Sequence, residues 1–350
     1  MSLTPSPPAP LAQTPHISTT VFASAIVLVA AVSIGATSAY FVLVPHPTCT
    51  GSDCTTVVDD LGRKIQTPVN PGRIVVLAPS IMDIIYRLGL RSTVVAVGCT
   101  PSIAGGIFNE YSPQQASLWG LANASCVPDY PELNTQAVGL LTPQLVLAST
   151  ITSAEAVQEL TDTYGIPVVV LASSTLDGIV GDVRTVAQIF PEAGGTAVTL
   201  EVSLEKTIAS ASAMDENFSN ENVSIPAVLL TYYFDSGGYY TYGTGSFGDS
   251  LISYAGGDNI ASSVPLLYGE YNGSTALLAQ PQLIVYATSN DTYLVGGETP
   301  SVWATAPYWS LFNATKVAVE VQLVTEADPT MIFFLPHLMH LFHPTLIPAP

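Results

Sequence analysis

The sequence contains very few basic residues. Among its 350 residues are 8 Lys and Arg against 27 Asp and Glu, so the formal net charge is −19. Nucleic-acid binding is excluded, because contacts to phosphates require clustered Lys and Arg side chains. Charged residues make up only 10% of the chain, whereas hydrophobic residues make up 48% and can form a large core. At this length we expect about two domains.

Charged side chains are absent altogether from residues 1–52. Residues 1–20 are rich in proline, which predicts a disordered N-terminus. The apolar run at 21–44 is long enough for a helix to cross a bilayer core of about 30 Å. A cleaved signal peptide is the alternative, but such peptides have a basic start and a shorter apolar region. We therefore expect an uncleaved transmembrane anchor and then a linker at 45–55.

No Cys-x-x-Cys motif occurs, which argues against metal binding by the four cysteines. An even number of cysteines in an exported protein indicates disulfides, and we favour Cys49–Cys54 and Cys99–Cys126, with buried free thiols as the alternative. Asn-x-Ser/Thr sequons, the acceptors of N-linked glycans, are also more frequent than chance predicts. They lie at Asn123, Asn217, Asn222, Asn272, Asn290 and Asn313. Together these features predict a glycosylated body on the extracellular side of the cell membrane.

Short runs of Val, Ile and Leu alternate with helical segments along the rest of the chain. Continuous apolar strands separated by helices are typical of parallel sheets that are covered on both faces. Buried strands are expected at 73–77, 94–97, 145–148, 167–171, 227–232, 283–286 and 317–319, and helices at 175–190, 191–217 and 329–342. The pattern predicts an α/β protein: an N-terminal lobe (56–175), bridging helices (176–222) and a C-terminal lobe (223–350).

Several motifs resemble those of cobalamin- and iron-siderophore-type periplasmic binding proteins, the solute-binding subunits of ABC importers. In order, they are VVDDLGRK (57–64) with PGRIVVLAPS (71–80), NTQA (134–137) with PQLVLA (143–148), GIPV (165–168), GSFGD (245–249) with AGGDNI (255–260), QPQLIV (280–285) and a helix ending in HP (343–344). The resemblance implies two Rossmann-like lobes joined by one long backbone helix. It also implies a non-enzymatic, monomeric protein that has no cofactor, binds a corrinoid or an iron chelate, and works with an importer permease.

The ligand is expected beyond the carboxyl ends of the strands, between the lobes. We expect loops there at 79–80, 117–120, 235–244 and 268–272, rich in aromatic rings that suit a large planar ligand. The candidate ligand-binding residues are Pro79, Ser80, Trp119, Tyr239, Tyr240, Tyr242, Tyr268 and Tyr271. Ordinary packing of these side chains is the alternative. Because the loops lack Arg and Lys, a neutral cobamide is favoured over an anionic siderophore; direct iron ligation by tyrosinate is a further alternative.

One departure concerns docking to the permease. The family commonly places a Glu on each lobe for this contact, whereas the matching positions here are Gln136 and Ser253, with Asp249 as one candidate substitute. A surface structural or adhesive protein that kept the fold without transport is therefore the alternative function. His337, His340 and His343 recur every three residues near the C-terminus. We expect a helix end there and no metal site.

Overall fold

The N-terminal lobe of the computed structural model is built on the apolar strands expected from the sequence. Strands β1 (Cys54–Val58) and β2 (Lys64–Pro68) form an antiparallel hairpin. A six-stranded sheet follows, in the order β5-β4-β3-β7-β8, with β6 paired to β4. Its strands are β3 (Ile74–Val76), β4 (Val94–Pro101), β5 (Ile107–Phe108), β6 (Ser125–Pro128), β7 (Leu145–Ala148) and β8 (Val168–Val170). All pairs are parallel except β4–β5.

Helices cover this sheet because its central strands are buried along their whole length, as in β3, β7 and β8. They are α2 (Pro79–Arg87), α4 (Thr135–Leu140) and α5 (Ala154–Asp162). A disulfide between Cys99 of β4 and Cys126 of β6, with Cα atoms 5.7 Å apart, confirms one of the two predicted pairs. Cys54 is also disulfide-bonded. Its predicted partner, Cys49, lies outside the described residues.

The structure describes residues 51–101, 107–108, 117–121, 124–129, 131–220, 223–265, 267–288 and 299–350. The predicted anchor at 21–44 and the disordered stretch at 1–20 lie outside these ranges. Within them, no helix is both long enough and apolar enough to span a membrane. Residues Pro47–Pro350 form one compact unit.

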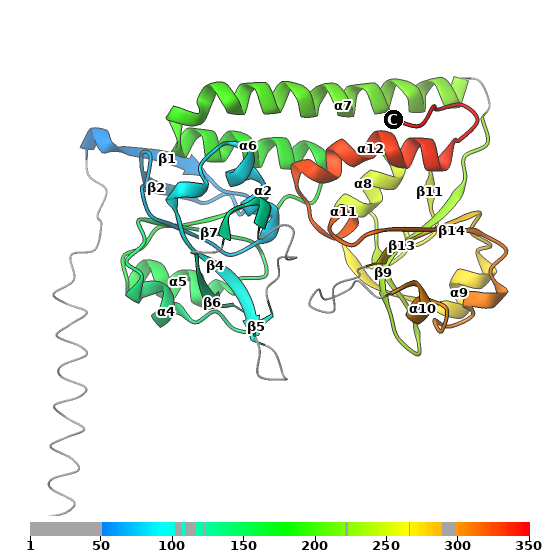
Figure 1. Ribbon diagram of the computed structural model, residues 1–350, viewed down its shortest axis with the longest axis horizontal. Coiled ribbons are helices and arrows are strands. Elements are labelled where there is room, and N and C mark those ends of the chain that lie inside the picture. Colours follow the sequence, from blue (N-terminus) through cyan, green and yellow to red (C-terminus); the bar gives the residue numbers. More distant parts are fainter. Residues whose placement is uncertain are drawn as a thin grey trace, which may run out of the picture. The chain divides into compact units, whose positions relative to one another are not determined.

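Two helices connect the sheets of the lobes. Helix α6 (Leu176–Ile189) begins at Thr175, whose hydroxyl accepts the Gly178 N–H, and a 3₁₀ turn at Pro191–Ala193 leads into α7 (Gly194–Asn220). The two helices run side by side, with α7 the longest element of the fold (Figure 1). Arg184 of α6 donates to Glu201 (2.7 Å) and Glu205 of α7, which ties the pair together.

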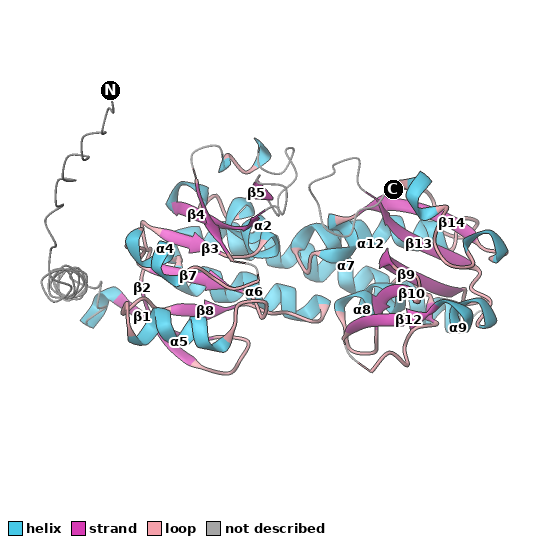
Figure 2. Ribbon diagram, turned by 90° about the horizontal axis from the view of Figure 1, so that it is seen from below, coloured by secondary structure: helices cyan, strands magenta, loops and turns pink. Residues whose placement is uncertain are grey.

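The C-terminal lobe contains a second six-stranded sheet, in the order β12-β10-β9-β13-β14, with β11 paired to β9 (Figure 2). Its strands are β9 (Ala227–Phe234), β10 (Gly238–Tyr242), β11 (Asp258–Asn259), β12 (Tyr268–Asn272), β13 (Leu283–Thr288) and β14 (Thr315–Glu320). Its helices are α8 (Phe247–Tyr254), α9 (Gly273–Leu278), α10 (Pro300–Trp303), α11 (Gln322–Thr325) and α12 (Pro329–Phe342).

This sheet corrects one expectation. Residues 238–242 and 268–272, expected as loops, are the antiparallel strands β10 and β12. The hairpin β9–β10 turns at residues 235–237, and β12 is one of the two edge strands, with β14 at the other edge. Neighbouring side chains of β10 therefore point to opposite faces of the sheet.

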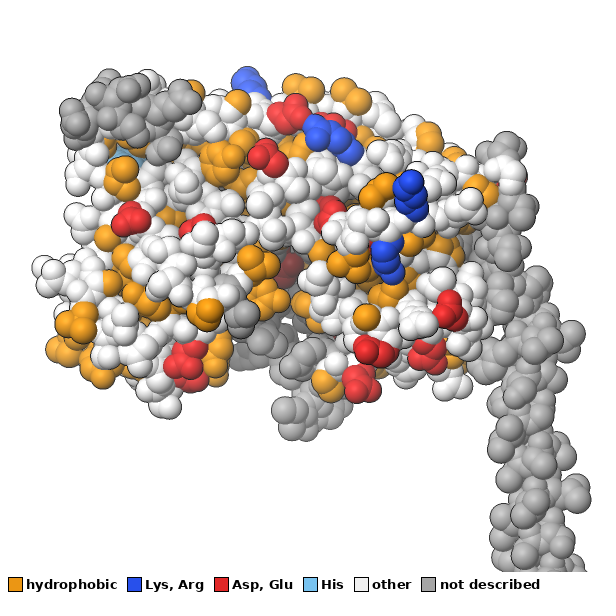
Figure 3. Space-filling view, turned by 180° about the vertical axis from the view of Figure 1, so that it is seen from behind, with side chains coloured by type: hydrophobic (Ala, Val, Ile, Leu, Met, Phe, Trp, Pro, Cys, Tyr) orange, Lys and Arg blue, Asp and Glu red, His pale blue; other side chains and the backbone are white. Residues whose placement is uncertain are grey.

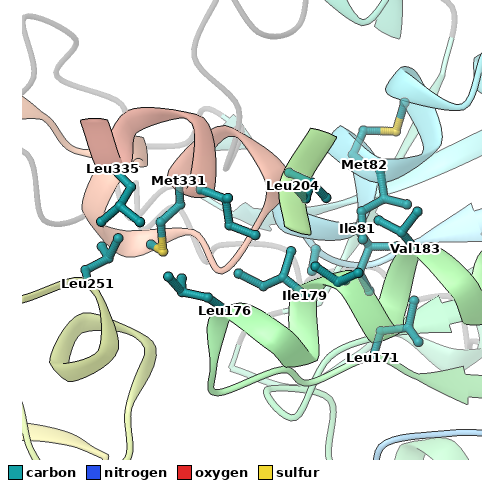
Figure 4. Packing of buried hydrophobic residues seen from close by; sticks show 14 of the residues in the cluster. Ile81, Met82, Leu171, Leu176, Ile179, Val183, Leu204, Leu251, Met331 and Leu335 are labelled. Carbon is teal, nitrogen blue, oxygen red and sulfur yellow. The ribbon is translucent and has the colours of Figure 1, made fainter. Parts of the chain in front are cut away.

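The two lobes share one hydrophobic core. Buried residues of α2, α6 and α7 and of α8 and α12 belong to the same cluster. In Figure 4, Leu176 and Ile179 of α6 lie toward Leu251 of α8 and Met331 of α12. The lobes are thus joined by packed side chains as well as by the backbone of α7. Such a joint favours small movements over wide hinge opening.

Candidate functional site

The candidate site lies where β9 ends and turns into β10. In open α/β sheets, ligands bind beyond the carboxyl ends of the parallel strands, and β9 pairs in parallel with β13. The turn is tight: a Cβ atom on Gly238 would lie 2.2 Å from the carbonyl oxygen of Tyr271, so only glycine fits there. This close approach brings β10 against β12 and sets their tyrosines in register.

Three of the predicted ligand-binding tyrosines are buried in the C-terminal lobe. Tyr239 and Tyr271 pair across β10 and β12 and pack in a cluster with Trp303 and Phe312. Tyr239 is 0% exposed, and its hydroxyl donates to the Pro307 carbonyl. Tyr242 is buried in the main core and donates to the Val324 carbonyl. These three rings stabilise the lobe, and the hydroxyls of Tyr239 and Tyr242 are already hydrogen-bonded.

The other two tyrosines are accessible and have aromatic neighbours. Tyr268 is 55% exposed, and Tyr240 is half-buried. The ring of Tyr240 lies 5.4 Å from that of Tyr233, its partner on β9, and 6.5 Å from that of Tyr232. Tyr233 is itself 39% exposed. The hairpin and β12 thus present aromatic rings to solvent, as a binding surface for a planar ligand requires.

Two carboxylates flank Tyr240. Asp235 accepts the Gly237 N–H at 2.7 Å, the Gly238 N–H at 3.3 Å and the Tyr240 hydroxyl at 3.3 Å. Glu270 stands directly opposite Tyr240 on β12 and is exposed. The backbone hydrogen bond from Gly237 is the main cause that lowers the pKa of Asp235, and the negative charge of Asp235 in turn raises the pKa of Tyr240. The surface is therefore both aromatic and acidic.

Sequence reasoning did not single out Asp235 or Glu270. Both stand within four residues of a candidate tyrosine, so acids flanking a tyrosine cluster were the available signal. Their convergence depends on the pairing of β10 with β9 and β12, which was not predicted.

The predicted N-terminal candidates lie on the other lobe. Pro79, the first residue of α2, is buried and stands three residues after the end of β3, and the next residue, Ser80, is half-buried. Trp119 is 3% exposed and packs in the main core. Of these three, only Ser80 has a partly accessible side chain.

Basic residues are nearly absent from the C-terminal lobe. Its only Lys or Arg is Lys316; the other seven stand at or before residue 206. Lys316 donates to the Phe312 carbonyl at 3.0 Å and lies over the Trp309 ring at 5.6 Å, so it is engaged away from Tyr240. On the face shown in Figure 3, basic side chains lie over the N-terminal lobe and the bridging helices, and acidic ones are spread over both lobes.

The predicted docking positions differ in accessibility. Gln136 in the first turn of α4 and Ser253 on α8 are exposed. Asp249 accepts the Gly245 N–H at 3.1 Å and the Asn259 side-chain N–H at 2.9 Å. Both carboxylate oxygens of Asp249 therefore hold the start of α8.

Two of the C-terminal histidines contact backbone carbonyl groups. His343 contacts the Gly256 carbonyl at 2.9 Å, and His340 contacts the Ile347 carbonyl at 2.6 Å. Within the described ranges, no three His, Cys, Asp or Glu side chains are grouped as a metal site requires.

Asn217, Asn272 and Asn313 are exposed, as glycan acceptors need to be. The sequons at Asn123, Asn222 and Asn290 lie outside the described residues.

Comparison with known proteins reveals distant relatives. No family model matches the chain. The chain is 25% identical over 342 residues to a protein named "Cobalamin-binding protein" from Halobacterium salinarum. That match covers 93% of this chain and 85% of the relative.

Solved structures share the fold. One is the periplasmic haem-binding protein RhuT from Roseiflexus sp. RS-1 in apo form, with a TM-score of 0.59 and 21% identity over 78% of this chain and 98% of that chain. Another is an ABC-type Fe3+-hydroxamate transport system from Saccharomonospora viridis, with a TM-score of 0.63 and 18% identity over 83% of this chain and 99% of that chain. The predicted resemblance to periplasmic binding proteins of the cobalamin and iron-siderophore type is confirmed.

Proposed function

We propose that the chain is the extracytoplasmic solute-binding subunit of an ABC importer and that it captures a cobalamin-like corrinoid. The observation that carries the choice of ligand is the surface around Tyr240: exposed aromatic rings beside Asp235 and Glu270, on a lobe whose only basic residue is engaged elsewhere. The relative named for cobalamin binding supports the same choice.

Charge separates the candidate ligands. Haem carries two propionates, and many siderophores are anionic, so their binding sites need Arg or Lys to neutralise them. A propionate placed beside Asp235 and Glu270 would meet two carboxylates, and like charges at short range raise the free energy of the complex. The rim of a corrin ring instead carries carboxamides, whose N–H groups donate to carboxylates. An acidic, aromatic surface therefore favours the corrinoid.

Direct iron binding by tyrosinate is disfavoured by the same surroundings. The negative charge of Asp235, with a smaller effect of Glu270, raises the pKa of Tyr240. Burial raises the pKa of the neighbouring Tyr232 to about 12. Both hydroxyls therefore keep their protons at neutral pH, and a tyrosine that keeps its proton is a poor ligand for Fe(III).

The proposal includes a membrane tether at 21–44 and an importer permease as the partner. The apolar length of that segment supports the tether. Exposed, uncharged Gln136 and Ser253 would contact the permease through hydrogen bonds, without the salt bridges of relatives that carry Glu at these positions.

The test is a binding comparison with three ligands. The purified full-length chain, in mild detergent, is titrated with cyanocobalamin, haemin and a ferric hydroxamate while its tryptophan fluorescence is followed. Saturable quenching by cyanocobalamin alone supports the proposal. Binding of haemin or the hydroxamate in its place would overturn the ligand, and binding of none of the three would favour the structural or adhesive alternative.

A further inference from the structure

A polar network joins the two lobes through α2 and α12. Arg87 of α2 donates from Nε to Asp83 Oδ2 at 2.7 Å, and from Nη2 to the Thr330 hydroxyl of α12 at 2.9 Å. The Thr330 hydroxyl donates to the same Asp83 oxygen at 3.1 Å. The guanidinium also lies over the Phe333 ring of α12, 5.2 Å from its centre. One arginine thus links two elements that stand more than two hundred residues apart in the sequence.

The network borders the hydrophobic core shared by the lobes. Met82 of α2 and Met331 of α12, each adjacent in sequence to a network residue, are fully buried in that core. Any change in how α2 meets α12 is therefore passed to the packing between the lobes.

A second carboxyl group, Asp328, is buried at the same joint. Asp328 is 2% exposed, and its Oδ1 accepts the Met331 N–H at 3.0 Å as the N-cap of α12. The charged groups that face it are Asp83 and Arg87 on α2 and Glu326 on its own segment. The Tyr242 hydroxyl, on β10, faces Glu326 in turn. Arg87 therefore faces both Asp83 and Asp328, two carboxyl groups that one guanidinium cannot neutralise if both are ionised.

We propose that this network is a pH-sensitive joint between the lobes: it holds α2 against α12 while Asp328 is protonated, and it loosens when Asp328 becomes ionised beside Asp83. The geometry gives the reason, since a new buried charge facing Asp83 competes for Arg87 and weakens its bonds to Asp83 and Thr330. The proposal is independent of which ligand the protein carries.

The direction of the effect follows from the pKa of Asp328. Burial raises this pKa well above its ordinary value, with Asp83 and Glu326 adding to the rise and Arg87 opposing it. For a carboxyl whose folded-state pKa is raised, the folded form holds a proton that the unfolded chain has lost, so stability declines as the pH rises toward the folded pKa. The joint is therefore tighter in mild acid than in mild base.

Hydrogen exchange with mass spectrometry tests the joint in the full-length chain. Protection factors of peptides from α2 and from the start of α12 are compared at pH 5 and pH 8, each corrected for the intrinsic exchange rate. The wild-type chain is expected to lose protection severalfold at pH 8. Asp328→Asn keeps the N-cap, because Asn and Asp cap equally well, and it is expected to lose clearly less protection at pH 8 than the wild-type chain.

Two further variants keep the test decisive. Thr330→Val removes the hydroxyl that links Arg87 to α12 and is expected to lower protection at both pH values. Asp162→Asn changes an exposed acid of α5, whose carboxylate accepts the Gln158 side-chain N–H, and is expected to keep the wild-type pH response. An unchanged pH response in Asp328→Asn, or a reduced response in Asp162→Asn, would overturn the proposal.

Discussion

Tyr239 and Tyr240 are neighbours on β10, yet their hydroxyls bond on opposite faces of the sheet. Tyr239 is fully buried and donates to the Pro307 carbonyl, whereas Tyr240 is half-buried and donates to Asp235. The alternation of side chains along a strand causes this separation. It divides the tyrosine-rich hairpin into one face that holds the lobe together and another that is available to a ligand.

Substitution of the two tyrosines separates these roles. Tyr239→Ala empties a packed site and is expected to cost about 3–5 kcal/mol of unfolding free energy. Tyr240→Ala, on a partly exposed ring, is expected to cost less than about 1 kcal/mol while it weakens ligand binding. Urea denaturation measures the first effect and ligand titration the second. Equal stability losses in both variants would contradict the two-faced hairpin.

The buried acid Asp182 predicts a pH-dependent stability. It accepts the Ser173 hydroxyl at 2.7 Å, and burial, followed by the charge of Asp60, raises its pKa to about 8. Between about pH 4 and 8 the unfolded chain loses this proton and the folded chain keeps it, so stability falls as the pH rises. Asp182→Asn is expected to flatten that decline, as seen in urea midpoints at pH 5 and pH 8. The exposed Asp162→Asn on α5 is the control, and a decline of wild-type size in Asp182→Asn would refute the assignment.

The Cys99–Cys126 disulfide is expected to stabilise the N-terminal lobe. It closes a loop with a sequence separation of 27, for which loop-closure entropy predicts about 3–4 kcal/mol. The double variant Cys99→Ser, Cys126→Ser should therefore unfold at a clearly lower temperature, measured by circular dichroism. A thiol titration of the denatured wild-type chain provides the control and should detect no free cysteine. An unchanged melting temperature would show that the bond does not stabilise the lobe.

Asn272 offers a clean test of glycosylation. Its side-chain oxygen caps α9 by accepting the Ser274 and Thr275 N–H groups, so replacing Asn272 would also remove the cap. Ser274→Ala destroys the sequon and keeps the cap. Intact-mass measurement on protein from its native host is expected to show the loss of one glycan in Ser274→Ala. An identical mass, apart from the substitution, would mean that Asn272 is not modified.

Elements with strong local signals were predictable from the sequence. Helix α12 has the predicted bounds because Asp328 caps it and Pro329 occupies its first turn. Strand β7 also has its predicted bounds, since its four residues are all buried between α-helical layers. A capping residue or an apolar run is formed by residues that are close together in the sequence, so it can be recognised without knowing the fold.

The β9–β10 hairpin and strand β12 could not be predicted from such local signals. Gly237, Gly238 and Gly269 indicate loops, and β10 and β12 are strands only because they pair with each other and with β9. The burial of Tyr239 depends on Trp303 and Phe312, which stand more than sixty residues later in the chain. Contacts between residues so far apart in the sequence produce no periodic pattern. The structure was therefore needed to tell which tyrosines are buried in the core and which are accessible.

Calorimetric titration with cyanocobalamin is the most direct test of the central claim. The full-length chain is compared with the double variant Tyr240→Ala, Tyr268→Ala and with Tyr308→Ala, a control at another exposed tyrosine of the same lobe. We predict saturable binding to the wild-type chain and to Tyr308→Ala, and affinity at least about tenfold lower, or 1.4 kcal/mol, in the double variant. Absence of binding to the wild-type chain, or equal affinity in all three proteins, would contradict the account.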